Sequence, residues 1–426
     1  MTTTASFLGE TAARAKTAAR ALARLPRGQK DAALLRIAEL LETDQAAILE
    51  ANAKDVAAAR EAGLDDYMVE RLTLNSARLN GIAAETRQVA SLDDPVGEVF
   101  DSRTLPNGLL IGRRRVPLGV IACIYESRPN VTIDIASLCL KSGNASILRG
   151  GKEARHSNAA LGVILQRALA DTGLPADAVQ VISDPDRALV DELLGMGTAI
   201  DLVIPRGGKS LVEHVRAHAT MPVIAGGIGV VHIYVDRAAD VQMALDIVDN
   251  AKRRRYSICN AVDTVLVHAA IAPAFLARLA ELWAGNVTVL GDTRAVSLLQ
   301  PLANGGLDVQ PALPDDWDTE HLALRCGIRL VESMDEALEH IEQHGSGHSE
   351  AIVSEDYTAA MRFMDEVDSA AVYVNASTQF TDGAQFGLGA EVAISTGKVH
   401  ARGPLGLREL TSYKWTIFGK GQVRPL

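Results

Sequence analysis

The sequence predicts an α/β protein with parallel, doubly wound sheets, and three observations lead to this prediction. The chain has 426 residues, 48% hydrophobic and 22% charged, which is typical of a globular protein large enough for two or three domains. A helical stretch precedes two long regions in which short apolar strands alternate with helices. No low-complexity linker separates these regions, so we expect interleaved domains.

The first elements are helices, followed by a hairpin. Residues 7–92 carry apolar side chains at helical spacing, and Asp44 and Asn75 are expected to cap helices in this stretch. Two extended segments then flank an Asn-Gly pair, a dipeptide that favours a tight turn. We therefore expect a β-hairpin over residues 96–117.

Strands and helices then alternate over residues 119–235. This pattern predicts a parallel sheet, because each crossover between parallel strands needs a connection of helix length. A second alternating region covers residues 236–375, and a glycine-rich tail begins near residue 384. The expected strands are 119–125, 145–148, 179–182, 200–204, 222–225, 230–235 and 262–267, and the expected helices are 131–140, 153–170, 187–194, 211–218 and 240–252.

Composition limits the classes of function. A net charge of −11 argues against a general nucleic-acid-binding protein, because the phosphate backbone requires a basic surface. The four cysteines are widely separated, which fits a reducing cytoplasm and gives no zinc framework. The N-terminus lacks the apolar core of a signal peptide, and no segment approaches the roughly 20 apolar residues that span a membrane. We expect a cytoplasmic protein with a small-molecule substrate, and neither nucleic acid nor membrane as a partner.

Cys259 ends a polar, basic loop and directly precedes an apolar strand. The thiolate is the reactive form of cysteine, and a free thiol with a pKa of about 8.5 is only slightly ionised at neutral pH. The four cationic side chains from Lys252 to Arg255 would favour the thiolate and attract an anionic substrate. Cys259 is therefore a candidate nucleophile, and a buried structural cysteine behind a solvated charge run is the alternative.

The same strand-to-helix turn, Arg-Gly-Gly-Lys, occurs twice in the first alternating region. Backbone N–H groups at a helix start bind anions, and glycine lets a ligand approach closely. The repetition favours a phosphate-bearing ligand, whereas ordinary turns relieved by glycine are the alternative. The G-x-G-x-x-G fingerprint is absent. The candidate cofactor-binding residues are Arg149, Gly150, Gly151, Lys152, Arg206, Gly207, Gly208 and Lys209.

Two further groups of polar residues are candidates for a site. Asn130 could donate a side-chain N–H to an oxyanion, and Arg128 could hold a carboxylate or phosphate. A cap for the following helix is the alternative role for Asn130. His340, His344 and His348 have spacing that can hold zinc, but a helix C-terminus explains them better, so we expect no metal.

Six segments carry a further pattern, namely Pro117–Thr132, Ser142–Ala154, Val231–Asp236, Cys259–Ala261, Val331–Ile352 and Phe386–Leu407. With these segments the chain resembles the γ-glutamyl phosphate reductases, a family of the aldehyde dehydrogenase superfamily. The resemblance covers essentially the whole chain. The last two segments separate this family from other aldehyde dehydrogenases.

The resemblance implies an NADPH-dependent reduction of L-γ-glutamyl 5-phosphate to L-glutamate 5-semialdehyde, with release of phosphate, in proline biosynthesis. Cys259 matches the family's nucleophile and would form a thioester. Arg128 and Arg255 would bind the anionic substrate, the two Arg-Gly-Gly-Lys turns would bind NADPH, and Glu320 aligns with the superfamily's nicotinamide-ribose glutamate. Gapless alignment places the superfamily's oxyanion asparagine at Arg128 rather than at Asn130.

The resemblance also implies roles for the parts of the chain. Residues 1–95 and 118–235 would form the NADPH-binding domain and residues 236–385 the catalytic domain of an aldehyde-dehydrogenase-like fold. Residues 96–117 and 386–426 would form a small β-hairpin oligomerisation element and the C-terminal tail. The hairpin and the tail are expected to pair across subunits, with an intramolecular flap as the alternative. We expect a homo-oligomer, either a dimer or a tetramer, and glutamate 5-kinase is a further candidate partner.

One departure from the superfamily bears on the mechanism. Hydrolytic aldehyde dehydrogenases carry a glutamate before a glycine pair, and it activates water against the thioester. Here Val223, Ile224 and Ala225 precede the glycine pair and none is acidic, which agrees with a reductase. Two competing functions are an acylating dehydrogenase with another acyl donor and an inactive nucleotide-binding scaffold. The intact Cys259 and basic turns argue against the scaffold.

Overall fold

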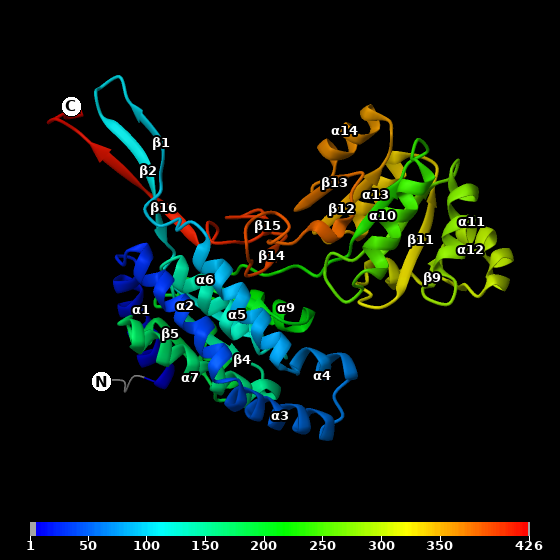
Figure 1. The fold of residues 1–426 in the computed structure, drawn as a ribbon. Coiled ribbons are helices and arrows are strands. Elements are labelled where there is room, and N and C mark those ends of the chain that lie inside the picture. The colour runs from blue at the N-terminus through cyan, green and yellow to red at the C-terminus, as the bar shows by residue number, and fades with distance from the viewer. Residues whose placement is uncertain (1–5, 425–426) are drawn as a thin grey trace. The chain divides into compact units, whose positions relative to one another are not determined.

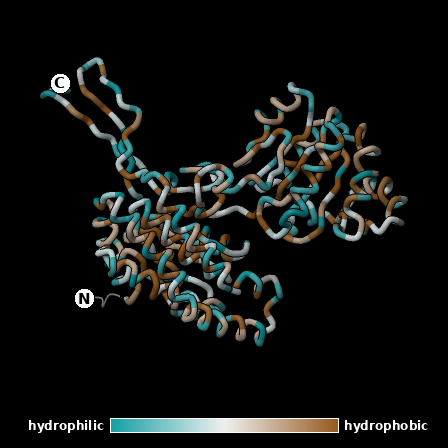
Figure 2. Tube along the Cα trace, in the orientation of Figure 1, coloured by the Kyte–Doolittle hydropathy of each residue, from teal (hydrophilic) through white to brown (hydrophobic). Residues whose placement is uncertain are grey.

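The computed structural model describes residues 6–424, which form two compact units. The first unit contains the described chain up to Ala225, together with Gly387–Ala393 and the segment from Leu405 onward. The second unit consists of Gly226–Phe386 and Ile394–Pro404. The chain thus passes between the units several times, which confirms that the domains are interleaved. In both units, hydrophobic and hydrophilic residues alternate along the chain trace (Figure 2).

The first unit begins with five helices, as the apolar spacing predicted (Figure 1). Asn75 caps the fifth helix, because its side chain accepts a hydrogen bond from the Arg78 N–H at 2.8 Å. Asp44 precedes the third helix, but its side chain does not cap it, and its carboxylate accepts from Arg167 instead. These helices are α1 (Phe7–Leu22), α2 (Arg27–Thr43), α3 (Gln45–Glu61), α4 (Asp66–Leu72) and α5 (Ser76–Ser91).

A four-stranded parallel sheet with the order β5-β4-β3-β6 forms the core of the first unit. The chain winds outward from β3 in both directions, so the sheet has a topological switch point between β3 and β6. Its strands are β3 (Val120–Tyr125), β4 (Ala145–Gly150), β5 (Val179–Ile182) and β6 (Leu202–Arg206). Its helices are α6 (Asn130–Lys141), α7 (Arg155–Thr172), α8 (Ala188–Leu194) and α9 (Lys209–His218).

Two strands expected after α9 differ from the prediction. Residues 222–225 make only an isolated parallel bridge, between Val223 and Val203 of β6. The next strand, β7 (His232–Val235), lies in the sheet of the second unit and not in the first sheet. Its side chains are all buried, as in either sheet, so the apolar pattern alone did not distinguish the two positions.

The expected hairpin is formed by β1 (Val99–Thr104) and β2 (Leu110–Pro117). Gly108 in its turn has φ +84° and donates its N–H to the Leu105 carbonyl. β16 (Thr411–Phe418) of the tail pairs antiparallel with β2 over the whole strand. The hairpin and the tail therefore pair with each other within one chain, and their pairing across subunits stays a prediction.

The second unit is built on a seven-stranded parallel sheet with the order β10-β9-β11-β8-β7-β12-β13. On β8, Val265 and Val267 pack into one apolar cluster with Trp283, while Leu266 packs into another with Phe363. Successive residues thus bury opposite faces, as a doubly wound sheet requires. The strands after β7 are β8 (Thr264–His268), β9 (Thr288–Gly291), β10 (Asp308–Pro311), β11 (Arg325–Val331), β12 (Ser349–Val353) and β13 (Ala371–Val374).

Four of the five helices of the second unit start at side chains that accept hydrogen bonds from the first turn, and the helix Ala272–Trp283 has no such cap. The four caps are Asp240, Asp292, Ser333 and Asp356. The helices are α10 (Val241–Arg253), α11 (Ala272–Trp283), α12 (Thr293–Leu299), α13 (Met334–His344) and α14 (Tyr357–Glu366). The short strands β14 (Ile394–Ser395) and β15 (Gly403–Pro404) form a separate ribbon. Within residues 6–424, no helix is long and apolar enough to cross a membrane.

Candidate active site

Cys259 lies in the loop between α10 and β8, at the start of the central strands of the second unit. It is partly exposed, whereas the three other cysteines are buried. Burial raises the pKa of the Cys123 and Cys326 thiols to about 12 and raises that of Cys139 further. These three thiols are inert at neutral pH, so Cys259 is the accessible thiol of the chain.

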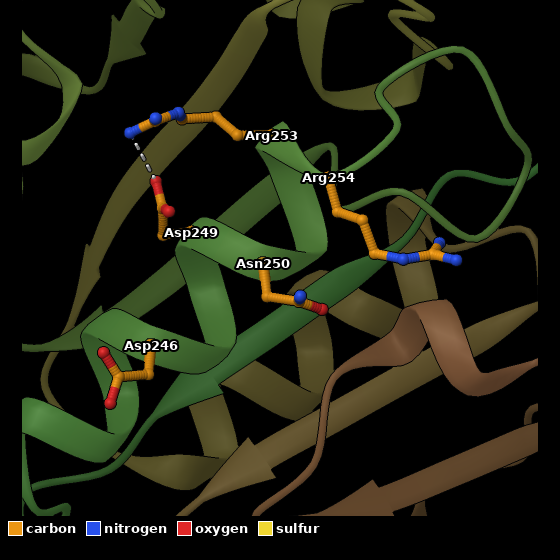
Figure 3. Close-up of a pocket in the computed structure, with 5 residues that line it drawn as sticks. All are labelled: Asp246, Asp249, Asn250, Arg253 and Arg254. Carbon is orange, nitrogen blue, oxygen red and sulfur yellow. Dashed lines mark hydrogen bonds and ion pairs between the residues drawn. The ribbon is translucent and has the colours of Figure 1, made fainter.

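The basic run before Cys259 does not act as one cluster. Lys252 is fully buried, and its Nζ donates to the Val262 carbonyl at 2.8 Å. Arg253 and Arg254 leave the end of α10 in opposite directions, along the rim of a shallow surface pocket that Asp246, Asp249 and Asn250 complete (Figure 3). Arg253 pairs with Asp249, and Arg254 donates to the Gln379 side chain.

Arg255 is the member of the basic run that is available to a ligand. It is exposed, and its guanidinium forms no ion pair among residues 6–424. Its carbonyl accepts a hydrogen bond from Gln379 Nε2 at 3.2 Å. Of the four cations that were expected to attract a substrate, only Arg255 remains a candidate. It lies four residues before Cys259.

The buried ammonium of Lys252 balances a buried carboxylate below the loop. Lys252 Nζ lies 3.7 Å from Asp263 Oδ1, and both side chains are inaccessible to water. Asp263 also accepts from the backbone N–H of His321 at 3.0 Å. Burial raises the pKa of Asp263 to about 6, although Lys252 opposes this shift. Lys252 is thus a structural cation and not part of a substrate surface.

In the first unit, the carboxyl ends of β3, β4 and β6 lie side by side, and both Arg-Gly-Gly-Lys turns are among them. Gly150 is buried, and a Cβ there would lie 2.0 Å from Asn158 Nδ2. Lys152 and Lys209 are exposed, and Arg206 is half-buried. Arg149 is buried, and its guanidinium donates to the Pro185 and Asp186 carbonyls of the loop after β5.

Two carboxylates that the sequence analysis missed occupy N–H groups at this edge of the sheet. Glu126 accepts from the Gly208 N–H at 2.9 Å, and a Cβ on Gly207 would lie 2.3 Å from the same oxygen. Glu153 accepts from the Ser127 N–H at 2.6 Å and from its hydroxyl at 2.9 Å. Ser127 has φ +41°, an uncommon conformation for a residue with a side chain. At the second turn the Gly208 N–H thus already meets an anion, the carboxylate of Glu126, and phosphate binding by the two turns stays a prediction.

Asn130 is the first residue of α6, and its side chain contacts the same helix. Its Nδ2 donates to Asp134 Oδ2 at 2.8 Å. Loss of solvent, and then the nearby Glu85, raise the pKa of Asp134 to about 7. One amide hydrogen of Asn130 is thus held by Asp134, which leaves the second for a ligand. Arg128, two residues earlier, is half-buried.

The remaining candidates lie in the second unit. Glu320 is half-buried in the loop before β11. α13 ends at His344 with Gly345 after it, so these histidines do mark a helix C-terminus. His340 contacts Arg329 at 2.9 Å, and His344 contacts Asp318 at 2.8 Å. Among the described residues, no group of three potential metal ligands converges.

His348 should make the folded protein less stable in acid. It is fully buried, and burial lowers its pKa from 6.5 to about 4. Between these values the unfolded chain binds the proton and the folded chain does not, so stability falls as pH drops below about 6.5. At pH 5.5 this histidine should lower the free energy of unfolding by about 1 kcal/mol. Urea unfolding at pH 7.5 and 5.5 should show a smaller loss in His348→Gln than in the wild type, and an equal loss would contradict the assignment.

Sequence relatives show the family of the chain. The model of the aldehyde dehydrogenase family matches residues 2–297, more than half of the chain. The chain belongs to the aldehyde dehydrogenase family. It is 54% identical over 416 residues to the gamma-glutamyl phosphate reductase of Dehalococcoides mccartyi, covering 97% of this chain and 98% of that protein. It is 55% identical to the enzyme of the same name from Roseiflexus castenholzii over 420 residues, 98% of this chain and 99% of that protein.

Solved structures of the family extend this likeness. The crystal structure of gamma-glutamyl phosphate reductase from Thermotoga maritima has a TM-score of 0.94 and 45% identity, covering 99% of this chain and 100% of that one. An engineered glycolyl-CoA reductase with bound NADP+ shares the fold, with a TM-score of 0.68, 16% identity and 96% coverage of each chain. The predicted aldehyde-dehydrogenase-like α/β fold, the resemblance and the oxidoreductase class are confirmed.

Proposed function

We propose that the protein reduces L-γ-glutamyl 5-phosphate to L-glutamate 5-semialdehyde and releases phosphate, as a step of proline biosynthesis. The observation that carries the proposal is the accessible Cys259 in a chain that is 54% identical to gamma-glutamyl phosphate reductases over nearly its whole length. An acylating dehydrogenase with another acyl donor is the competing function. The relatives' shared name favours the γ-glutamyl donor.

In this proposal the Cys259 thiolate attacks the acyl carbon of the substrate. The bond from carbon to the phosphate oxygen breaks, phosphate leaves with that electron pair, and the glutamyl group stays on Sγ as a thioester. When bound, NADPH supplies the hydride that reduces the acyl group. The backbone N–H of Cys259 and the free amide hydrogen of Asn130 are the donors we assign to the oxyanion.

We assign substrate binding to two arginines. Arg255 is exposed four residues before the nucleophile, and Arg128 precedes Asn130 by two residues. A guanidinium binds a carboxylate or phosphate through two parallel N–H donors, which suits both ends of γ-glutamyl phosphate. Val223, Ile224 and Ala225 offer no carboxylate that could activate water, so the thioester is preserved for reduction.

We assign the dinucleotide to the edge of the first sheet. The crevice at the carboxyl ends of strands, next to a switch point, is where open α/β sheets bind nucleotides. Gly207 and Gly208 are exposed at the second turn, Gly151 is buried at the first, and Lys152, Arg206 and Lys209 add positive charge. Arg149 supports this edge because its guanidinium holds the loop after β5. Glu320 is assigned to the nicotinamide ribose.

A phosphate-dependent assay in reverse tests the function, because γ-glutamyl phosphate is labile. Glutamate 5-semialdehyde, NADP+ and phosphate should yield NADPH, and NAD+ should serve poorly.

Lys152→Ala should lower the preference for NADP+ over NAD+ roughly tenfold, because an ammonium near the 2′-phosphate is lost. Lys54→Ala, also exposed, is the control. Equal use of NAD+ and NADP+ by the wild type would refute the 2′-phosphate assignment.

Glu126 should weaken cofactor binding, because its carboxylate occupies the Gly208 N–H at the edge assigned to the pyrophosphate. Glu126→Gln keeps an oxygen acceptor and removes the negative charge. We expect its Kd for NADPH, measured by fluorescence titration, to fall roughly fivefold. Glu61→Gln at the exposed end of α3 should leave the Kd unchanged. Weaker binding by Glu126→Gln would mean that the carboxylate supports the turn rather than competing with the ligand.

We further propose that the sheet of β1, β2 and β16 contacts a second copy of the chain. Val99, Ile417 and Phe418 are large apolar side chains that are more than half exposed on it, as is common where a partner covers a surface. We also propose that the protein forms a dimer or tetramer, that it is located in the cytoplasm, and that it contacts glutamate 5-kinase.

A further inference from the structure

The loop that carries Cys259 has no regular secondary structure, so other parts of the second unit must hold it in place. Two residues do so from different directions: Gly229, in the segment before β7, and Gln379, in the turn after β13. We propose that Gly229 and Gln379 are positioning residues for Cys259. This inference rests on the proposed role of Cys259 as the nucleophile.

Gly229 lies directly against the backbone of Cys259. An ideal Cβ on Gly229 would stand 1.6 Å from the carbonyl oxygen of Cys259 and 3.0 Å from its Cα. The φ angle of Gly229 is not positive, so the reason for glycine here is space and not backbone freedom. Any side chain at this position would have to push the Cys259 peptide away.

The segment of Gly229 is itself held, so it cannot yield easily. The next residue, Val230, donates its N–H to Ser346 Oγ at 2.9 Å, and its carbonyl accepts from the same hydroxyl at 3.4 Å. Val231 then leads into β7 inside the sheet, and its carbonyl accepts from the Asp263 and Thr264 N–H groups on the far side of Cys259. A side chain at Gly229 would therefore displace the nucleophile loop rather than the sheet.

Gln379 holds the loop at three points through one buried side chain. Its Nε2 donates to the Ala251 carbonyl at 2.8 Å and to the Arg255 carbonyl at 3.2 Å. Its Oε1 accepts from Arg254 Nη1 at 2.8 Å. The main-chain carbonyl of Gln379 accepts from Asn260 Nδ2 at 3.4 Å. The end of α10, the middle of the loop and the residue after Cys259 are thus tied to one glutamine.

These contacts have a consequence for the rate. Because the backbone of Cys259 is fixed on one side by Gly229 and its neighbours on the other by Gln379, Sγ starts from a defined position. A displacement of about 1 Å at a reacting group can cost about a hundredfold in rate. Loss of the contacts that Gly229 and Gln379 make with the Cys259 loop should lower kcat. The KM values for phosphate and semialdehyde should stay almost unchanged.

Gln379→Met tests the role of the Gln379 side chain, because methionine has nearly the same length and makes none of the three hydrogen bonds. We expect kcat of the phosphate-dependent reverse reaction to fall roughly a hundredfold, with KM for each substrate within about threefold. Gly229→Ala should lower kcat at least as much. The matched controls are Gln343→Met, exposed on α13, and Gly305→Ala, where a Cβ meets nothing within 4 Å. Both should keep the wild-type kcat.

A second readout needs neither substrate nor cofactor. Iodoacetamide alkylation of the folded protein reports Cys259, since the other cysteines are buried. The second-order rate constant and its pH profile should change in Gln379→Met and not in Gln343→Met. If the wild type is alkylated at Cys259 but lacks phosphate-dependent activity, the proposed function is wrong. The alkylation rates of the wild type and Gln379→Met still show in that case whether Gln379 positions Cys259.

Two results would overturn the inference. One is a folded Gln379→Met with wild-type kcat and wild-type alkylation. The other is a kcat that falls only in proportion to the fraction of folded protein, measured by circular dichroism, with an unchanged alkylation rate for the folded fraction. If Gly229→Ala does not fold, Gln379→Met alone decides between these outcomes.

Discussion

Cys259→Ala should abolish the phosphate-dependent reduction of NADP+ by glutamate 5-semialdehyde. We expect a loss of about 10⁴-fold or more, because the variant has no nucleophile to form the thioester. The Kd for NADPH should stay near the wild-type value, since Cys259 is not among the residues assigned to the cofactor. Activity follows NADPH absorbance, and the Kd comes from fluorescence titration.

Cys123→Ala is the control for this experiment. Cys123 is buried in β3, with a thiol whose pKa burial raises to about 12, so it cannot serve as a nucleophile at neutral pH. Its variant should lose some stability through the missing sulfur and keep its activity when folded. Retained activity in Cys259→Ala would reject the covalent mechanism outright.

Lys252→Met should be among the most destabilising substitutions near the active site. The change removes the ammonium that donates to the Val262 carbonyl and lies 3.7 Å from Asp263 Oδ1, and both charged side chains are buried. Without the cation, the carboxylate is left in the interior with only backbone N–H donors. Breaking a buried pair in this way costs about 3–5 kcal/mol, to be measured by urea unfolding at neutral pH.

A double-mutant cycle separates the pair from packing effects. Lys252→Met with Asp263→Asn should recover part of the loss, because neither charge is then left alone. Arg253→Met, at the surface end of the same basic run, should change stability by less than about 1 kcal/mol. If Lys252→Met is as mild as Arg253→Met, the buried pair does not hold the base of the Cys259 loop.

Local patterns were enough to predict most of the fold. The helical spacing of residues 7–92, the cap at Asn75 and the hairpin with Gly108 in its turn are all present. Each of these depends on residues close together in sequence. β7 was placed in the wrong sheet because strands buried on both faces have the same apolar pattern in any parallel sheet.

The environment of the candidate site was harder to predict, because burial depends on the tertiary fold. Lys252 is one of four consecutive cations, and the sequence alone does not show that it lies inside while Arg255 lies outside. Asp263, eleven residues later, is its partner, and an acid inside the apolar strand expected over 262–267 was the one available signal. Arg149 likewise was expected at the ligand and is buried against two carbonyls.

The contacts that the sequence analysis missed join residues far apart in the chain. Glu126 reaches Gly208 across two neighbouring strand ends, and Gln379 reaches Ala251 across the second unit. Nothing in the segments around Glu126 or Gln379 marks them as partners. The need for glycine at Gly229 became visible only from the position of the Cys259 carbonyl.

A pre-steady-state measurement tests most directly whether Cys259 passes its acyl group to hydride and not to water. The protein is mixed with glutamate 5-semialdehyde and NADP+ without phosphate, and NADPH is followed in a stopped-flow instrument. We predict a burst of one NADPH per chain that then stops, with glutamyl-Cys259 detected by mass spectrometry, and continuous turnover once phosphate is added. Continuous NADPH formation without phosphate would show that water cleaves the thioester and would contradict the proposed function.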